Sequence, residues 1–500
     1  MAQFPFCEAT VTDIHAALIR GDLSAKSLVE GYLARIDAYD CSGPKLNSII
    51  TVNPHALEQA QALDMQMAKS GQLSGLLHGI PVLVKDQAET AGILTSFGSE
   101  VMAEYLPEED AEVIRRLRAA GAIILAKTTM PDFATAWFSF SSRSTITRNP
   151  YDTACDPGGS SSGTGAAVAA NLGAIGLGED TGGSIRLPAS FNNLVGLKVT
   201  PGLISRRGLS PLVGFQDSAG PMCRTVSDAA RMMDVLAGFD AADMATVTAV
   251  IAGKKNYLAG LRTDALEGRR IGILRQAFGD QHDPRAAAVN EVMEEAISAI
   301  ARCGGEAIDF AVPDLDYYVE YTSLYITHSR HDIDQFLADR PALKHLNIAD
   351  ILASKRYDAR LDLLEAIGTG PEDPFTEADY YQRYIARETF QKLILKGMAE
   401  NGLDAFVFPT TQIAAPRHDE LAANEWTTLS FPTNTLIAAQ SWLPAVSVPA
   451  GFTTNGLPVG MEWVGLPYGE DGLLSYAYAF EQATQWRRAP ACAPELHAAP

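Results

Sequence analysis

Two segments rich in glycine and serine carry the residues of this sequence best suited to covalent chemistry. The first, Gly158–Gly163, reads Gly-Gly-Ser-Ser-Ser-Gly, and the second, Glu179–Pro188, places Ser184 directly after two glycines. Glycines let successive backbone N–H groups turn toward one point. Acyl transfer needs a serine hydroxyl beside preformed donors for an oxyanion. This pattern predicts a nucleophilic Ser184. The expected oxyanion hole consists of the N–H groups of Thr181, Gly182, Gly183 and Ser184.

A serine nucleophile needs a base, and Lys85 has a suitable position. It follows the apolar run Ile80–Val84, which reads as a buried strand. Burial disfavours the ammonium form, so a buried lysine can be neutral and accept a proton. Lys127 also follows an apolar run, Ala122–Ala126, and is the second candidate.

Other interpretations of the first segment are weaker. A phosphate-binding P-loop requires a lysine after its last glycine, whereas Thr164 follows Gly163, and neither segment contains the dinucleotide pattern GxGxxG. Residues 159–163 match the nucleophile elbow GxSxG with Ser161 at its centre. An elbow needs a strand directly before it, and Tyr151–Pro157 reads as a turn. A flexible linker would not explain the second glycine–serine segment.

Lys85, Gly158–Gly163 and Asp180–Pro188 together resemble the amidase signature family, whose motifs they match in order and spacing. The resemblance extends over nearly the whole chain. Further similar stretches are Leu23–Asp37, Thr147–Pro150, Gly196–Lys198, Gly220–Met222, Pro444–Phe452 and Gly456–Gly465.

The resemblance implies a role for each motif. Ser184 matches the acylated nucleophile, Ser160 the bridging serine and Lys85 the lysine of the triad. By the same analogy the Gly159–Ser160 peptide is cis, and the proton of Ser184 passes through Ser160 to neutral Lys85. The implied fold is α/β, with a large mixed β-sheet core covered by helices on both faces. The implied reaction is cleavage of a carboxylic amide, with release of ammonia or an amine.

Two positions depart from the family pattern. Many members have threonine where this chain has Glu179, and glycine is common where it has Ser162. Both positions lie near the catalytic turns and can tune the pocket. Asp180 and Arg186 have the types and spacing of a structural ion pair that holds the second segment.

The elements around these motifs alternate between strand and helix, which is typical of α/β proteins with parallel neighbours. The pattern predicts a small-residue helix over 166–175 and a second glycine turn over 176–184. The stretch 314–397 reads as mostly helical. Later strands are expected at 270–274, 403–408, 444–449 and 457–464.

Long helices between core strands favour one elaborated domain over separable modules. We expect a single domain over residues 1–500, with the signature core at about 75–230 and a helical elaboration at about 310–400. The loop Met130–Ser144 and the helical middle are expected to line the pocket. The sequence does not identify the substrate-binding residues, the acyl or amine group, or whether an ester, carbamate or hydrazide is preferred.

Charge and targeting features limit the partners. The net charge of −21 repels phosphate backbones and anionic lipid, so we expect neither nucleic acid nor a membrane as partner. No secretory signal or long apolar span is evident, and the six cysteines form no CxxC pair. These features favour a reduced, cytoplasmic protein. The resemblance also allows a homodimer.

No cofactor or metal is expected. His328 and His331 form an HxxH pair followed by Asp332, but three such residues without a further convincing ligand are a weak metal signal. Cys155 lies close to the first motif, and nothing nearby in sequence would activate it, so it reads as a plain loop thiol. The role of Asp217 is open.

Two enzymatic functions share the same triad. The first is a stand-alone amidase acting on non-peptide C–N bonds of linear amides, with a small-molecule amide as its substrate. The second is the glutamine-hydrolysing subunit of a tRNA-dependent amidotransferase. Members of the second kind usually carry Ser-Arg-Tyr-Gly before a Ser-Leu-Asp run, whereas this chain has Ser205–Gly208 as Ser-Arg-Arg-Gly and Phe215–Ser218 as Phe-Gln-Asp-Ser. The first function is therefore favoured. A non-catalytic binding protein on the same scaffold is disfavoured, because all three triad residue types are present.

Overall fold

The computed structural model describes residues 4–496, and within that range it forms one mixed sheet of eleven strands. The strand order is β1-β3-β2-β4-β6-β5-β10-β11-β9-β7-β8. The strands are β1 (Ile49–Val52), β2 (Pro81–Lys85), β3 (Ile123–Thr128), β4 (Ile175–Asp180), β5 (Val195–Lys198), β6 (Ser218–Cys223), β7 (Arg270–Leu274), β8 (Glu306–Phe310), β9 (Ala405–Pro409), β10 (Ala445–Phe452) and β11 (Pro458–Val464).

Parallel and antiparallel pairing occupy different parts of this sheet. Strand β2 runs parallel to β3 and β4, and β7 runs parallel to β8 and β9. The strands between these groups, from β4 through β6, β5, β10 and β11 to β9, pair antiparallel. With helices packed on both faces, the predicted large mixed-sheet α/β fold is confirmed.

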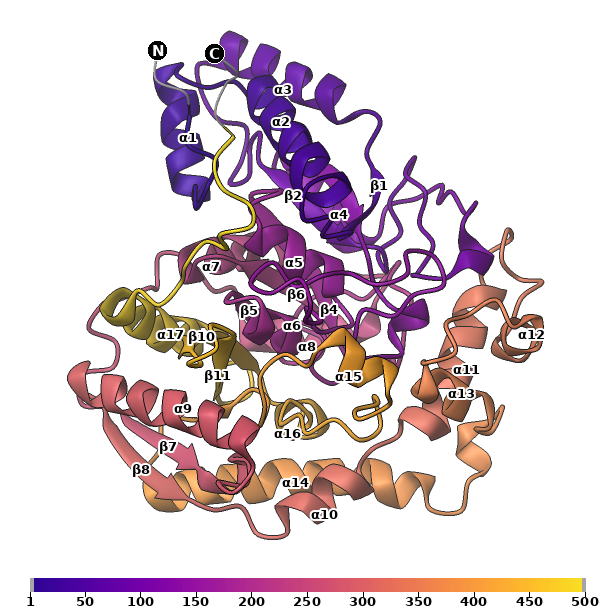
Figure 1. The fold of residues 1–500 in the computed structure, drawn as a ribbon, viewed down its shortest axis with the longest axis vertical. Helices are drawn as coiled ribbons and strands as arrows, with labels where there is room; N and C mark the ends of the chain where they lie inside the picture. The colour runs from indigo at the N-terminus through magenta and orange to yellow at the C-terminus, as the bar shows by residue number, and fades with distance from the viewer. Residues whose placement is uncertain (1–3, 497–500) are drawn as a thin grey trace.

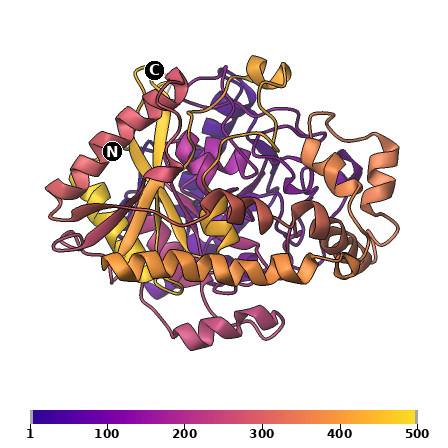
Figure 2. The same cartoon turned by 90° about the horizontal axis from the view of Figure 1, so that it is seen from below.

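The helices surround the sheet and extend it at one side. Figure 1 shows α11, α12 and α13 grouped away from the strands. Figure 2 shows the long α14 extending from beneath the strands toward that group. The helices are α1 (Val11–Arg20), α2 (Ala25–Arg35), α3 (Ala56–Ser70), α4 (Glu112–Ala119), α5 (Ser162–Ala169), α6 (Arg186–Phe191), α7 (Val226–Leu236), α8 (Val247–Ala252), α9 (Pro284–Arg302), α10 (Leu315–Tyr321), α11 (Tyr325–Ala338), α12 (Ile348–Ser354), α13 (Asp362–Gly368), α14 (Tyr380–Asn401), α15 (His418–Ala422), α16 (Leu436–Gln440) and α17 (Glu470–Thr484). Among residues 4–496, none of these helices combines the length and apolar character needed to cross a bilayer.

The buried apolar side chains of residues 4–496 form three hydrophobic cores, and the two with the most residues adjoin the candidate site. The larger one is built around the sheet and includes Val82, Ile175 and Trp463. A second core packs the helical group against the loops that follow β2 and β3, with Phe97 and Phe336 in edge-to-face contact. The active-site segments therefore lie where a rigid sheet meets a helical lobe.

The region between residues 162 and 184 differs from the prediction. The helix expected over 166–175 is α5, which begins earlier at Ser162 and ends at Ala169. The glycine turn expected over 176–184 is strand β4 as far as Asp180, and only the residues after Asp180 form the turn. A Cβ on Gly176 would lie 2.5 Å from Thr164 Cγ2, and one on Gly178 would lie 2.8 Å from Met222 Sδ. These glycines allow close packing around the strand. In the sequence alone they have the pattern of a turn, which is why the sequence predicts a turn here.

Candidate active site

Strand β2 places Lys85 in the interior of the protein. All five residues of β2 are buried, and Lys85 is 2% exposed. Its Nζ donates hydrogen bonds to Ser160 Oγ at 2.9 Å and to the backbone oxygen of Glu179 at 3.0 Å. Burial lowers the pKa of Lys85 from its ordinary value, while the neighbouring Glu179 carboxyl acts in the opposite direction. Two of the three expected triad residues are therefore in direct contact, in surroundings that favour a neutral amine.

The turn before α5 brings Ser160 to this lysine. The peptide bond between Gly159 and Ser160 is cis, as the resemblance implies. Ser160 is fully buried, so its contact with Lys85 is shielded from solvent. A Cβ on Gly159 would lie 2.8 Å from the backbone oxygen of Phe138, so the close approach of the two loops requires glycine.

Ser161 lacks the context of a nucleophile elbow. The residues before it form a turn and not a strand, as the sequence predicts. Its N–H donates to the backbone oxygen of Ser184 at 3.1 Å, and its hydroxyl lies 3.3 Å from the backbone oxygen of Glu179. These contacts join the two glycine–serine segments and give Ser161 a structural place.

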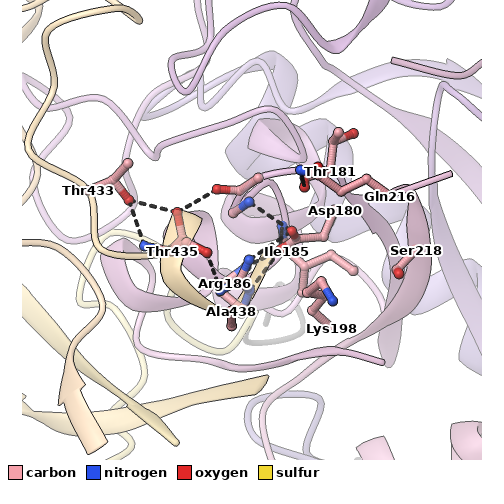
Figure 3. A network of polar contacts seen from close by, with 12 residues as sticks. Asp180, Thr181, Ile185, Arg186, Lys198, Gln216, Ser218, Thr433, Thr435 and Ala438 are labelled. Atoms are coloured by element: carbon pink, nitrogen blue, oxygen red, sulfur yellow. Dashed lines mark hydrogen bonds and ion pairs between the residues drawn. The ribbon is translucent and has the colours of Figure 1, made fainter. Parts of the chain in front are cut away.

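The turn from β4 to α6 positions Ser184. Asp180 organises it, because its carboxylate accepts from the N–H of Gly183 at 2.7 Å and from the N–H of Ile185 at 3.0 Å. The expected pair with Arg186 is present, with Arg186 Nη2 at 3.0 Å from Asp180 Oδ1. Figure 3 shows Arg186 between Asp180 and the segment around Thr435, whose backbone oxygen accepts from Arg186 at 2.9 Å. Burial alone would raise the pKa of Asp180, but the Arg186 guanidinium outweighs it and leaves that pKa below its ordinary value.

Uncommitted backbone donors surround Ser184. Among residues 4–496, the N–H groups of Thr181, Gly182 and Ser184 have no hydrogen-bond acceptor. The N–H of Gly183, also expected in the oxyanion hole, is donated to Asp180 in this structure. Within the same residues the Ser184 hydroxyl makes no hydrogen bond, so it is not yet joined to Ser160. Three free N–H groups beside a free hydroxyl form a suitable receptor for a carbonyl group.

A cavity of about 710 Å³ opens onto Ser184 and Gly182. One wall comes from Ala134, Ala136 and Trp137, which lie in the loop expected to line the pocket. The helical middle supplies most of the rest, again as expected. These residues are Asp316, Val319, Glu320, Ser323, Tyr325, Ile326, Thr327, Leu363 and Arg383. The segment Thr428–Leu436 also lines the cavity, and the sequence patterns did not indicate it.

A buried network behind the second turn likewise has no signal in the sequence patterns. Gln216 donates to the backbone oxygen of Thr181 and, at 3.0 Å, to the hydroxyl of Tyr325. Arg387 in turn donates to Gln216, and Asp217 accepts from Thr181 Oγ1 at 2.6 Å. The pair Gln216–Asp217 thus braces the turn that carries the free N–H groups. The sequence left the role of Asp217 open, and it did not indicate the partners on α11 and α14.

The remaining residues considered in the sequence analysis make no hydrogen bond with Lys85 or Ser160 among residues 4–496. Lys127 is fully buried, and its Nζ donates to the backbone oxygen of Ala88 at 2.6 Å and to Thr95 Oγ1 at 2.8 Å. Cys155 is buried, which raises the pKa of its thiol to about 12 and disfavours the reactive thiolate.

His328, His331 and Asp332 do lie close together, but their polar atoms already have partners. Asp332 Oδ1 lies 3.2 Å from His328 Nε2 and 3.1 Å from His331 Nδ1. Asp332 Oδ2 accepts from Gly214 N at 2.7 Å, and the Tyr380 hydroxyl lies 3.0 Å from His328 Nδ1. This arrangement is a satisfied hydrogen-bonded cluster that joins α11 to its neighbours, and we assign it no ligand.

Comparison with known proteins gives one family. The Amidase family model matches residues 27–474. The A subunit of glutamyl-tRNA(Gln) amidotransferase from Acaryochloris marina is 33% identical over 495 residues, covering 96% of this chain and 99% of that protein. The native peptide amidase structure from Stenotrophomonas maltophilia is 36% identical with a TM-score of 0.85, covering 98% of this chain and 99% of that one. The structure of the A subunit of the Thermotoga maritima amidotransferase is 26% identical with a TM-score of 0.75, covering 96% of each chain.

This protein belongs to the amidase signature family, as the motifs indicated. The matches span nearly the whole chain and include the segments that carry Lys85, Ser160 and Ser184. Hydrolysis of an amide is the activity that these relatives support.

Proposed function

We propose that the protein is an amidohydrolase that cleaves a carboxylic amide through an acyl-enzyme on Ser184, with Ser160 and Lys85 as its proton relay. One observation carries this proposal: the buried 2.9 Å hydrogen bond between Lys85 Nζ and Ser160 Oγ, beside a free Ser184 hydroxyl. A lysine whose pKa is lowered by burial can act as a base at moderate pH.

The proposed reaction gives each of these groups one step. Ser184 Oγ attacks the amide carbonyl and gives its proton to Ser160, whose own proton passes to Lys85 Nζ. The free N–H groups of Thr181, Gly182 and Ser184 stabilise the oxyanion that forms. Donation of the proton back along the same path to the leaving nitrogen releases ammonia or an amine. Water then attacks the acyl-enzyme and gives its proton through Ser160 to Lys85. The relay returns that proton to Ser184 Oγ as the free acid leaves.

The cavity favours an apolar acyl group. Its lining near Ser184 includes Trp137, Leu212 and Phe431 together with other apolar side chains. The acidic groups Asp316 and Glu320 also line it. We therefore propose a linear amide of an apolar or aromatic acid as substrate. A C-terminally amidated peptide is a second form of the same class, because the peptide amidase of Stenotrophomonas maltophilia shares the fold.

Glutamine hydrolysis for an amidotransferase is the alternative. The 33% identity to the amidotransferase A subunit over 96% of the chain favours it. Glutamine has a charged α-carboxylate and α-ammonium, which must be paired when they leave water. The cation among the cavity residues is Arg383, whose guanidinium already donates to the backbone oxygens of Tyr321 and Ser323. This commitment weighs against glutamine as the substrate.

A fluorophosphonate probe tests the nucleophile. Purified protein is labelled, and the modified peptide is located by mass spectrometry, with Ser184→Ala and Ser161→Ala as matched serine variants. Labelling that is lost only in Ser184→Ala supports the proposal, whereas labelling at Ser161 contradicts it. A panel of an aromatic amide, a C-terminally amidated peptide and glutamine, assayed without any partner protein, then separates the substrate classes.

A further inference from the structure

Glu179 is a buried carboxyl in contact with the base of the proposed relay. It is 1% exposed, and its Oε2 lies 3.3 Å from Lys85 Nζ. Thr181 Oγ1 lies 3.2 Å from Glu179 Oε1 and 2.6 Å from Asp217 Oδ1.

The groups facing Glu179 come from two strands, the loop before β6 and one helix. Lys85 on β2 is the cation in contact with it, and Asp180 on β4 and Asp217 before β6 are the nearby acids. Asp180 is paired with Arg186, and Tyr325 on α11 is a further titratable neighbour. Burial raises the pKa of Glu179, and the Lys85 ammonium opposes this rise. The nearby acids Asp217 and Asp180 raise the pKa of Glu179 further.

Burial shifts the pKa values of Lys85 and Glu179 in opposite directions. It lowers the pKa of Lys85 and raises that of Glu179, while the 3.3 Å contact joins the two groups. Two groups in such contact titrate as a unit, with proton affinities that belong to the pair. A change at Glu179 must therefore alter the proton affinity of the amine that contacts Ser160.

We propose that Glu179 is a positioning residue that acts through Lys85, and that the two side chains together take up the proton that leaves Ser184 through Ser160. The proposal rests on the proposed function. The Ser184 O–H bond breaks as its oxygen attacks the carbonyl, Ser160 gains that proton and gives up its own, and an N–H bond forms on Lys85. The carboxylate of Glu179, 3.3 Å away, stabilises the ammonium and so strengthens the base. The same proton returns to the leaving nitrogen.

Glu179→Gln removes the charge with little change of shape. Lys85 Nζ keeps its bonds to Ser160 Oγ at 2.9 Å and to the backbone oxygen of residue 179 at 3.0 Å, neither of which involves the carboxyl. Glu179→Asp keeps the charge on a shorter side chain. Glu470→Gln is the matched control, because Glu470 is equally buried but binds the N–H of Thr200, away from Lys85.

The experiment measures the second-order rate of fluorophosphonate labelling at Ser184 as a function of pH in the full-length protein. In Glu179→Gln we expect the maximal labelling rate to fall about tenfold. We also expect the acid limb of the pH–rate profile, where the rate falls as Lys85 is protonated, to move about one pH unit lower, because a lone lysine binds its proton less tightly. Glu179→Asp is expected to keep the wild-type limb and recover part of the rate. Glu470→Gln should match the wild type in both.

Each other outcome overturns the inference. A slower Glu179→Gln with an unmoved limb means that Glu179 is only structural, and an unchanged rate and limb mean that it is uninvolved. Glu179→Thr, with the residue common in the family, is expected to show the same downward shift and supplies the test if the glutamine variant does not fold. Wild-type protein that is folded but not labelled at Ser184 overturns the proposed function, and this inference with it.

Discussion

Two buried lysines end neighbouring parallel strands, and they differ in what they contact. Lys85 ends β2, and Lys127 lies on β3 opposite Val84. Both are at most 2% exposed, and burial lowers the pKa of both. Each also faces a carboxyl, with Glu179 at 3.3 Å from Lys85 and Asp86 at 3.4 Å from Lys127. By sequence position, burial and charge the two sites are nearly equivalent.

The difference lies in the third partner. Lys85 Nζ contacts the hydroxyl of Ser160, which belongs to the segment joined to Ser184, whereas Lys127 contacts Thr95 and the backbone of Ala88. A buried lysine with a lowered pKa is thus insufficient to mark a base. Under the proposed mechanism, a hydroxyl that can pass a proton toward a cavity is the feature that separates the proposed base from a structural lysine.

Lys85→Met should have the largest effect on activity. The amine is lost while most of the side-chain volume stays, and the buried Glu179 carboxyl can take up a proton in place of its partner. We expect kcat/KM for an amide substrate to fall about 10³-fold or more. Steady-state kinetics on protein with an unchanged circular dichroism spectrum would check this. Activity within a few fold of the wild type would remove the distinction between the two lysines.

Ser160→Ala tests the link between Lys85 and the nucleophile. Without this hydroxyl the proposed relay lacks the group that carries the proton of Ser184 to Lys85, so we expect a loss of about 10²-fold or more in kcat/KM. The double variant Ser160→Ala/Lys85→Met shows whether the two residues act together. Residues that work as one relay give a double loss close to the larger single loss, and additive losses would show that they act separately.

Lys127→Met should affect stability and not chemistry. It removes the buried donor to Thr95 Oγ1 and to the Ala88 carbonyl, and the cation beside Asp86 Oδ1, at a cost of about 3 kcal/mol in the free energy of unfolding. Urea denaturation measures this cost. At a temperature where the variant is folded, kcat/KM and its pH profile should match the wild type. A displaced acid limb would assign Lys127 a catalytic role.

Ser161→Ala should have the smallest effect. Its backbone N–H still reaches the Ser184 backbone oxygen at 3.1 Å. The variant loses only the long contacts of the hydroxyl with the backbone oxygen of Glu179, at 3.3 Å, and with the N–H of Glu179, at 3.4 Å. We expect kcat/KM within about fivefold of the wild type. A loss as large as that of Ser160→Ala would restore the elbow interpretation.

Local patterns predicted the parts of the site that lie within one motif. The apolar run before Lys85 specified a buried strand, and the glycines before Ser184 specified a tight turn with free N–H groups. The same glycine signal misled at Gly176 and Gly178, where small residues serve packing within β4. Composition alone does not distinguish a glycine needed for a turn from one needed for close approach.

Contacts between distant segments were beyond the sequence. Thr435 donates to the backbone oxygen of Gly182 at 2.6 Å, and Arg387 reaches the active-site turn through Gln216. Their polar side chains carry no periodic or motif signal, because their roles depend on how α14 and the segment before α16 pack on the site. The resemblance to a family indicated the fold, while these supports required the structure.

Trapping the acyl-enzyme is the most direct test of the central claim. Protein mixed with an activated aromatic ester is quenched in acid within the first turnover and digested, and the acylated peptide is identified by mass spectrometry. We predict acyl mass on Ser184, accumulating more slowly in Lys85→Met and at the wild-type rate in Lys127→Met. Acyl mass on Ser161 or on Cys155, or equal slowing by both lysine variants, would contradict the claim.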